Sequence, residues 1–358
     1  MSVGADGSFI DKFANRRRLL DESPMRLIFG PCVLAWFLLA VHLARCDEKD
    51  SPRSSADFQL KGSGPITCVR AVPGRPLVAF GAIDGVIRLW EPVEGSVADE
   101  LRGGPGPVFQ LAVDPKGKWL VSRHIKGDIV IWDLDKKARS SVDSTKLKGA
   151  FPFAGAHGDT LLLCGADGRR DKSVHVWSIS DGRETQTLEG HKRSICAVAA
   201  MASGSRIVSG DLDGEVIVWD VPSGKISHRI PAHVKKDRSV MAVEYLTFLG
   251  GTSLFATGSM DDHKVEIWDA NDGNRKKTFA VESMCALAAS SDGKRLAIGD
   301  PDGWVSVWDT ESWARVRHFA AHDGSVSGLA FAHDSKLLVT ACHPELRSDG
   351  EVKAWKLK

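Results

Sequence analysis

The chain has 358 residues, of which 47 are basic and 46 are acidic, so its formal charge is +1. Proteins that bind nucleic acids usually carry a clear excess of basic residues, so this near-neutral balance argues against a nucleic-acid partner. Hydrophobic residues make up 43% of the chain and charged residues 26%, which is typical of a folded globular core. Tryptophan occurs 11 times and tyrosine once, which indicates a repeated structural position for tryptophan.

The N-terminal region divides into three predicted segments. Residues 1–26 are basic, residues 27–45 are hydrophobic, and residues 46–54 form a polar linker. Residues 27–44 carry no formal charge, and as a helix they would span roughly 27 Å, slightly less than a ~30 Å hydrocarbon core. Because basic residues precede this segment, the positive-inside rule predicts a cytoplasmic N-terminus and export of the chain beyond the segment. We therefore expect one hydrophobic N-terminal helix that anchors the protein in a membrane or directs its export.

Several interpretations of this hydrophobic segment stay open. It is a retained signal anchor, a cleaved signal, or a lipidation signal with Cys46 as the acceptor, although Arg45 departs from the usual lipobox pattern. Met25 stands directly before a compact signal-like sequence, so it competes with Met1 as the true start. The alternative is a buried helix of a cytoplasmic protein, which the apolar character of every face of the segment disfavours.

From residue 55 onward the chain repeats one pattern. A short run of alternating β-branched residues contains or ends in a tryptophan, which is typical of a half-buried strand. A turn with Asp and Gly stands before most of these runs, and another apolar strand stands before the turn. Successive tryptophans are 40 to 49 residues apart. They are Trp90, Trp132, Trp177, Trp219, Trp268, Trp308 and Trp355.

Seven such units, each with about four short strands, resemble the WD-repeat (WD40) β-propeller family. Four units carry the Trp-Asp dipeptide, and Gly190-His191 matches the Gly-His motif of that family. The resemblance covers roughly residues 55–358 and implies an all-β, seven-bladed WD-repeat propeller. The chain stops after the third strand of its last unit, while residues 56–62 match an outer strand. The resemblance therefore implies that this N-terminal strand completes the last blade and closes the ring, which removes an exposed sheet edge.

The resemblance also assigns a role to histidine, serine or threonine, aspartate and tryptophan residues that recur together. In WD-repeat proteins, matching residues form a buried hydrogen-bonded tetrad, so we expect structural tetrads. A Ser–His–Asp set also fits a catalytic triad, but its recurrence at the repeat period and the absence of a G-x-S-x-G motif favour the structural role. The expected tetrads are His191, Ser209, Asp213 and Trp219; His233, Thr257, Asp261 (or Asp262) and Trp268; and His322, Thr340, Asp349 and Trp355.

Two units depart from the tetrad pattern. Phe80 replaces the serine in the first unit, near Asp84, and the unit that ends at Trp308 has no Gly-His motif. We expect packing alone to hold these two blades, which should make them locally softer than the others.

The cysteines and the remaining motifs give no sign of a cofactor or metal ion. Seven cysteines include no C-x-x-C pair, so a zinc ribbon or a thioredoxin-like site is not expected. Cys68, Cys196 and Cys285 stand in similar apolar contexts, and we interpret them as small buried residues at one repeated strand position. The chain has no P-loop, H-E-x-x-H motif or dinucleotide-binding fingerprint, and its Asp-rich turns lack the glutamate of a calcium loop.

Basic residues are predicted to gather on one face of the propeller. In this family the connections between fourth and first strands and between second and third strands lie on the face that usually binds partners. Arginine and lysine there would hold an acidic or phosphorylated peptide. If neighbouring aspartates offset their charge, the same residues form an ordinary solvated rim. The candidate partner-binding residues are Arg169, Arg170, Lys172, Lys192, Arg193, Lys235, Lys236 and Arg238.

Together these observations predict a monomeric, non-catalytic WD-repeat scaffold for protein or peptide partners. Residues 27–44 would tether the propeller to a membrane or export it, so that it lies on the non-cytoplasmic side. The alternative function is an exported propeller enzyme or small-ligand binder that uses the central channel, because propellers also host enzymes. That alternative requires acidic or metal-binding residues converging from several blades.

Overall fold

The chain divides into two compact units, Met1–Glu48 and Lys49–Lys358, and all described residues belong to the second. Every regular element among the described residues is a β-strand, as the repeated pattern predicts. The predicted helix at residues 27–45 lies outside them. The computed structural model describes residues 55–61, 64–104, 106–125, 128–140, 153–155, 160–164, 172–233, 241–260, 262–343 and 350–357.

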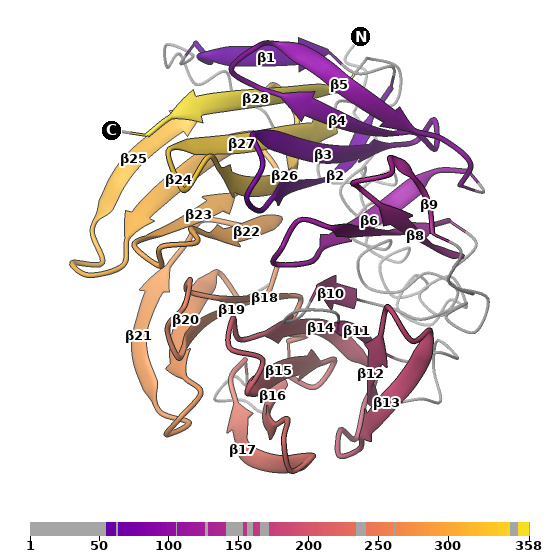
Figure 1. The fold of residues 1–358 in the computed structure, drawn as a ribbon. Coiled ribbons are helices and arrows are strands. Elements are labelled where there is room, and N and C mark those ends of the chain that lie inside the picture. The colour runs from indigo at the N-terminus through magenta and orange to yellow at the C-terminus, as the bar shows by residue number, and fades with distance from the viewer. Residues whose placement is uncertain are drawn as a thin grey trace, which may run out of the picture. The chain divides into compact units, whose positions relative to one another are not determined.

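The described strands form seven four-stranded sheets, which we call blades 1 to 7 (Figure 1). Neighbouring strands in each blade run antiparallel. Blade 1 contains β2 (Ile66–Val72), β3 (Leu77–Ala82), β4 (Ile87–Glu91) and β5 (Ser96–Leu101). Blade 2 contains β6 (Val108–Val113), β7 (Trp119–His124), β8 (Ile129–Asp133) and β9 (Ala138–Arg139). Blade 3 contains β10 (Phe153–Gly155), β11 (Thr160–Cys164), β12 (Val174–Ser178) and β13 (Arg183–Leu188).

The remaining blades follow the same scheme, except that blade 7 takes strands from both ends of the chain. Blade 4 contains β14 (Ile195–Ala200), β15 (Arg206–Asp211), β16 (Glu215–Asp220) and β17 (Lys225–Pro231). Blade 5 contains β18 (Tyr245–Phe248), β19 (Leu254–Gly258), β20 (Lys264–Asp269) and β21 (Arg275–Ala280). Blade 6 contains β22 (Ala286–Ala289), β23 (Arg295–Gly299), β24 (Trp304–Asp309) and β25 (Arg315–Ala320). Blade 7 is ordered β1 (Phe58–Lys61), β28 (Glu351–Lys356), β27 (Leu337–His343), β26 (Ser325–Ala332).

The core of the propeller lies between the blades. The four consecutive residues of β16 from Val216 to Trp219 are apolar and buried, so the middle of the strand is covered on both faces. One apolar cluster joins Leu89 of blade 1 to Trp132 of blade 2. Another joins Trp90 of blade 1 to Val339 of blade 7. The repeated tryptophans therefore stabilise contacts between neighbouring blades as well as their own sheets.

The innermost strands of the seven described blades form a closed ring. β2, β6, β10, β14, β18, β22 and β26 are neighbours in this order, and β26 is also a neighbour of β2. The blades therefore surround a common axis, as Figure 1 shows. This arrangement confirms the predicted all-β propeller.

The ring closes where β1 pairs with β28. Phe58 lies opposite Ala354 in antiparallel register. Asp57 extends the pairing, since its amide donates to the carbonyl of Ala354 at 3.1 Å and its carboxylate accepts from the amide of Lys356 at 2.7 Å. The N-terminal strand thus covers the outer edge of the last blade, which confirms the predicted closure.

Removal of β1 should open the ring. A chain that starts at Ile66 lacks the partly buried side chains of Phe58 and Leu60 and the hydrogen bonds to β28. With about 1 kcal/mol for each side chain and each hydrogen bond, we expect the free energy of unfolding to fall by at least ~3 kcal/mol. The exposed edge of β28 should also promote self-association. Calorimetry and light scattering measure the two effects.

A chain that starts at Ser55 is the matched control, because it lacks the N-terminal region but keeps β1. Equal melting temperatures for the two truncated chains, with both monomeric, would contradict the role of β1 in closure.

Candidate functional site

One end of the propeller carries the loops that the sequence predicts as the binding face. In blade 1, Ile66 at the start of β2 pairs with Ala82 at the end of β3, and Ile87 at the start of β4 pairs with Leu101 at the end of β5. The β3–β4 turn therefore lies at the same end as the connections into β2 and out of β5. The other blades repeat this topology. We call this end the loop face.

Blade 4 holds a buried hydrogen-bonded tetrad beneath the loop face. The indole Nε1 of Trp219 donates to the Ser209 hydroxyl at 2.8 Å, and this hydroxyl lies 2.7 Å from His191 Nε2. His191 Nδ1 lies 2.9 Å from Oδ2 of Asp211. Because a carboxylate only accepts hydrogen bonds, Nδ1 of the neutral ring carries the proton and Nε2 accepts from the hydroxyl. These bonds tie the connection that carries the histidine to β15 and β16.

The prediction that Asp213 belongs to this tetrad is wrong, because Asp211 contacts the histidine instead. Asp211 at the end of β15 contacts His191 through one oxygen, and its other oxygen accepts from the amides of Asp213 and Glu215 at 2.9 and 3.1 Å. Asp213 lies further along the turn, where it pairs with exposed Arg193 at 3.3 Å. Both aspartates of the Asp-Leu-Asp-Gly sequence suit a turn, but only the first stands at the strand end, where its side chain both starts the turn and reaches the histidine.

Blade 5 repeats the arrangement. His233 Nε2 lies 2.9 Å from the Thr257 hydroxyl, to which Trp268 Nε1 donates at 3.2 Å. His233 Nδ1 lies 2.6 Å from Asp262. Of the two aspartates that the sequence left open, Asp262 therefore makes the contact, and Asp261 lies outside the described residues. Burial would raise the pKa of Asp262, but the interactions with His233 and with Lys264 together hold that pKa below its ordinary value.

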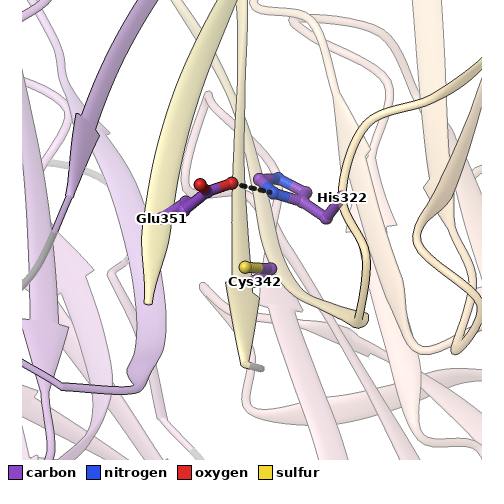
Figure 2. Close-up of side chains that lie close together, drawn as sticks. All are labelled: His322, Cys342 and Glu351. Atoms are coloured by element: carbon purple, nitrogen blue, oxygen red, sulfur yellow. Dashed lines mark ion pairs between the residues drawn. The ribbon is translucent and has the colours of Figure 1, made fainter. Parts of the chain in front are cut away.

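Blade 7 brings together three of its four predicted residues. The Thr340 hydroxyl lies 2.7 Å from His322 Nε2 and accepts from Trp355 Nε1 at 3.0 Å. The predicted Asp349 lies outside the described residues. Cys342 and Glu351 stand close to Nδ1 of the histidine, with the nearer glutamate oxygen 3.7 Å away (Figure 2).

Blade 2 contains a rearranged set that sequence analysis did not identify. Ser122 accepts from Trp132 Nε1 at 2.8 Å and lies 3.0 Å from Nε2 of His124, which comes from the same strand, β7. The other ring nitrogen lies 2.8 Å from the carbonyl oxygen of Gly106. A Cβ on Gly104 would lie 2.0 Å from the ring, so the connection needs glycine there. The available signal was a serine ten residues before the repeat tryptophan, as in blade 4.

Blades 1 and 6 lack the tetrad, as predicted. Phe80 and Ile298 stand ten residues before the repeat tryptophans, the position that Ser122 has in blade 2 and Ser209 in blade 4. Within the described part of the chain, the indole nitrogens of Trp90 and Trp308 are buried and have no hydrogen-bond partner.

Packing alone does not hold blade 1, so that prediction is wrong for this blade. Arg88 of β4 pairs with Asp84 in the β3–β4 turn at 2.7 Å and with Glu100 of β5 at 3.1 Å. The arginine is largely buried, and its two carboxylate partners connect the turn to the two outer strands.

Asp300 in blade 6 shows the effect of a missing histidine. It stands two residues after Ile298, the position that Asp211 has in blade 4, and it accepts from the amides of Asp302 and Trp304 at 3.0 and 2.8 Å. The connection before this blade has no Gly-His motif to pair with the carboxylate. Burial, together with the charge of Asp302, raises the pKa of Asp300 to about 6.

Three of the predicted partner-binding residues lie within the described part of the chain. Lys172, Lys192 and Arg193 are exposed on the loop face. Arg193 pairs with Asp213 at 3.3 Å, so part of its charge is offset. The others lie outside the described residues, and their role stays a prediction. They are Arg169, Arg170, Lys235, Lys236 and Arg238.

Two exposed isoleucines on the loop face are not anticipated by the sequence analysis. Ile83 in the β3–β4 turn is 41% exposed, and Ile125 after β7 is 48% exposed. They have the same turn position in neighbouring blades, in AIDG and HIKG. A Cβ on Gly85 would lie 2.8 Å from the carbonyl oxygen of Gly106, and a Cβ on Gly106 would lie 3.7 Å from Ile125. The connection into blade 2 therefore packs between the two turns, and we call Ile83 and Ile125 the isoleucine pair.

Two groups of described side chains have donor atoms close enough to share a metal ion, within 4.8 Å of one another. In the blade 4 group the histidine and aspartate already hydrogen-bond to each other. In the blade 7 group, burial raises the pKa of the Cys342 thiol to about 11, while His322 and Lys353 lower the pKa of Glu351 to about 2. The groups are His191, Asp211 and Glu215, and His322, Cys342 and Glu351.

Comparisons with known proteins identify the repeat. A family model described as "WD domain, G-beta repeat" matches residues 56–91, 182–220, 273–309 and 313–356. Autophagy-related protein 16 of Arabidopsis thaliana is 25% identical over 175 residues, which cover 49% of this chain and 33% of that protein. A ribosome biogenesis protein WDR12 homolog of Chlamydomonas reinhardtii is 25% identical over 294 residues, with coverages of 70% and 63%.

Pre-mRNA-processing factor 19 of Bos taurus is 25% identical over 310 residues, which cover 81% of this chain and 56% of that protein. The chain thus spans between a third and just under two thirds of the length of these relatives. Among solved structures, a chain of "Crystal Structure of Mitotic Checkpoint Complex" superposes with a TM-score of 0.71 at 20% identity, covering 88% of this chain and 97% of that one. This likeness shows a shared fold.

The Trp219 hydrogen bond should have a measurable energy. Trp219→Ala should lower the free energy of unfolding by about 3–5 kcal/mol, because it removes a fully buried aromatic side chain. Trp219→Phe should lower it by about 1–3 kcal/mol, because the Ser209 hydroxyl loses its donor. Trp90→Phe is the matched control. It should lower the free energy of unfolding by less than Trp219→Phe does, since the Trp90 indole has no hydrogen-bond partner among the described residues. Urea unfolding measures all three, and equal losses for the two phenylalanine variants would contradict this account of the tetrad.

Asp300 should make stability depend on pH. Its folded pKa of about 6 exceeds the ordinary value of 3.8, so the folded state holds more protons between these values and the free energy of unfolding falls as pH rises through them. Asp300→Asn keeps an acceptor for the two amides but cannot ionise. We expect the melting temperature of the wild type, relative to this variant, to fall between about pH 4 and pH 7. A difference that stays constant over this range would show that Asp300 does not titrate as described.

Proposed function

Because the chain belongs to the WD-repeat β-propeller family, we propose that it is a non-catalytic scaffold that binds protein or peptide partners through the loop face. The relatives carry names from autophagy, ribosome biogenesis and pre-mRNA processing. Such variety on one fold supports a shared binding platform rather than a shared reaction. The propeller acts as a monomer, with its ring closed within one chain.

The isoleucine pair is the observation that carries this proposal. Protein interfaces combine an apolar centre with a polar rim, and exposed apolar side chains on adjacent turns can supply such a centre. Ile83 and Ile125 are held on turns that pack against one connection, so a partner would find them already positioned. Exposed polar residues elsewhere on the loop face, such as Lys192, would supply the rim.

The basic residues favour a partner segment that is acidic or phosphorylated. Lys172 and Lys192 lie on the loop face of blade 3 and of the connection into blade 4, where they would form charge-assisted hydrogen bonds with carboxylate or phosphate. Arg193 would join them by breaking its ion pair with Asp213 and forming one with the partner. The other predicted basic residues, which lie outside the described part of the chain, stay candidates for the same role.

The geometry of the histidine–serine sets supports a structural role for them. A catalytic serine must reach a substrate, whereas the side chains of His191 and Ser209 are buried and bonded on both sides. The alternative function, an enzyme or small-ligand binder that uses the central channel, predicts no dependence on the loop face.

We also propose that residues 27–44 tether the propeller to a membrane or direct its export to the non-cytoplasmic side. The support is their uncharged apolar sequence and the basic residues before them. In the part of the chain that the structure describes, no helix is long and apolar enough to cross a membrane. Deletion of residues 27–44 should move the protein from the membrane or exported fraction to the cytosolic fraction, and an unchanged distribution would contradict this proposal.

Loss of the isoleucine pair should prevent partner capture. The double variant Ile83→Glu, Ile125→Glu places charges on exposed turns, so the propeller should still fold while recovery of the partner falls at least about tenfold. Val316→Glu is the matched control, because Val316 is 58% exposed on the outer strand β25, away from the loop face. Crosslinked affinity capture from the native host, with quantitative mass spectrometry, measures the recovery.

A partner that is lost from the double variant and retained by the control would support the proposal. A second variant, Lys235→Glu, Lys236→Glu, Arg238→Glu, tests the basic part of the surface in the same experiment. Equal recovery from all variants would place the interface elsewhere. The absence of any specific partner would contradict the scaffold and favour the channel alternative.

A further inference from the structure

Blades 4 and 7 contain corresponding sets of side chains that differ in chemical type at one position. In both, a histidine stands 18 residues before a hydroxyl residue, and a glutamate stands four residues before the repeat tryptophan. The residue two positions after the hydroxyl is Asp211 in blade 4 and Cys342 in blade 7. The register agrees, since Asp211 pairs with Ile195 and Cys342 with Val326, each near the start of an innermost strand. The other corresponding pairs are His191 and His322, Ser209 and Thr340, Glu215 and Glu351, and Trp219 and Trp355.

Cys342 stands where Asp211 contacts the histidine in blade 4, and within the described part of the chain one nitrogen of His322 has no acceptor. The His322 side chain is 0% exposed, and its Nδ1 has no hydrogen-bond partner among the described residues. The nearest carboxylate oxygen, on Glu351, lies 3.7 Å away, which is beyond hydrogen-bond distance. A buried polar atom without a partner is unfavourable, so among the described residues this nitrogen is available to a ligand in blade 7.

We propose that His322, Cys342 and Glu351 bind a divalent transition-metal ion of the zinc type. Their donor atoms Nδ1, Sγ and a carboxylate oxygen lie within 4.8 Å of one another. Figure 2 shows the His322 ring and the Glu351 carboxylate facing each other, with Cys342 beside them. Imidazole, thiolate and carboxylate are the donor types that zinc takes at about 2.0–2.3 Å, so a small inward movement would place all three around one ion. The fourth position would be open to water.

The hydrogen bonds of the blade are compatible with the histidine tautomer that such a site needs. The Thr340 hydroxyl lies 2.7 Å from His322 Nε2 and can accept its proton, which leaves the Nδ1 lone pair for the metal. Metal-bound histidines usually donate their second N–H in this way. When the ion binds, the Cys342 thiol releases its proton to solvent and binds as the thiolate, while Glu351 binds as the carboxylate.

Lys353 is the cation that competes for Glu351. Its amino group lies 2.8 Å from one Glu351 oxygen and 3.0 Å from the carbonyl oxygen of Ala321. This Glu351 oxygen, Oε2, is also the one that lies 3.7 Å from His322 Nδ1, so an ion that binds it must displace the lysine, or the carboxylate must turn to present its other oxygen. The Glu351 side chain is 30% exposed, which gives an ion a path from solvent to the buried histidine and cysteine.

The corresponding group in blade 4 serves as an internal comparison. Both oxygens of Asp211 are engaged, one by His191 and the other by two backbone amides that hold the turn. A metal ion there would have to break these bonds and would find no thiolate. We therefore expect binding in blade 7 and none in blade 4.

Cobalt(II) is the probe, because a thiolate bound to cobalt gives a charge-transfer absorption that imidazole and carboxylate ligands do not give. The full chain, reduced, kept in detergent and stripped with EDTA, should develop this absorption on titration with Co²⁺ and lose it on addition of Zn²⁺. Cys342→Ala should abolish it although six other cysteines remain. Cys342→Asp should also lack it, and in EDTA this variant should melt above Cys342→Ala because the aspartate can accept from His322.

Zinc provides a second readout. At about 100 times its Kd, zinc should raise the melting temperature of the wild type by ~4 °C and leave that of Cys342→Ala unchanged. Circular dichroism in EDTA checks that both variants fold. Asp349→Asn should bind cobalt as the wild type does, and loss of binding in it would overturn this ligand set. The proposal is also overturned if Cys342→Ala keeps the absorption, or if the folded wild type shows none.

Discussion

The pairing of β1 with β28 is the constraint on which the rest of the structure depends. Neighbouring blades pack against each other through apolar side chains, and the first and last blades can do so only if they meet. Phe80 and Trp90 of blade 1 pack in one cluster with Val339 of blade 7, so an open ring would expose a core rather than a polar surface. The strand that closes the sheet edge is therefore also the strand that keeps this cluster buried.

Within the closed ring, the hydrogen-bonded side chains beneath the loop face differ from blade to blade, because buried polar groups can find their partners in several ways. A buried indole N–H, a hydroxyl and an imidazole must each find a partner. Blade 4 meets the requirement with Asp211, blade 5 with an aspartate later in its turn, and blade 2 with His124 from its own strand. Blades 1 and 6 replace the hydroxyl with Phe80 and Ile298 and leave an indole nitrogen unpaired among the described residues. Blade 7 keeps the hydroxyl but has cysteine in the place of the aspartate, which is why a ligand is inferred there.

The scaffold and the metal site use different parts of the same end of the propeller. The isoleucine pair lies on exposed turns of blades 1 and 2, where a partner can reach it. In the blade 7 group the side chains of His322 and Cys342 are buried, and Glu351 is its partly exposed member. Each proposal can therefore fail without affecting the other. A metal ion in blade 7 would stabilise the blade in which the two ends of the chain meet, and it would not need to take part in partner binding.

The sequence by itself determined the strands, the repeat period, the closing strand and the histidine–hydroxyl–tryptophan sets of blades 4, 5 and 7, because these follow from residue spacing along one chain. It did not reveal the set of blade 2, whose histidine comes from the same strand as its serine. It did not determine whether Asp211 or Asp213 faces His191, since both suit the turn and the choice depends on side-chain direction at the end of β15. It also did not reveal that Ile83 and Ile125 are exposed. Only the tertiary structure decided these points, because the direction and burial of a side chain depend on atoms that other segments bring next to it.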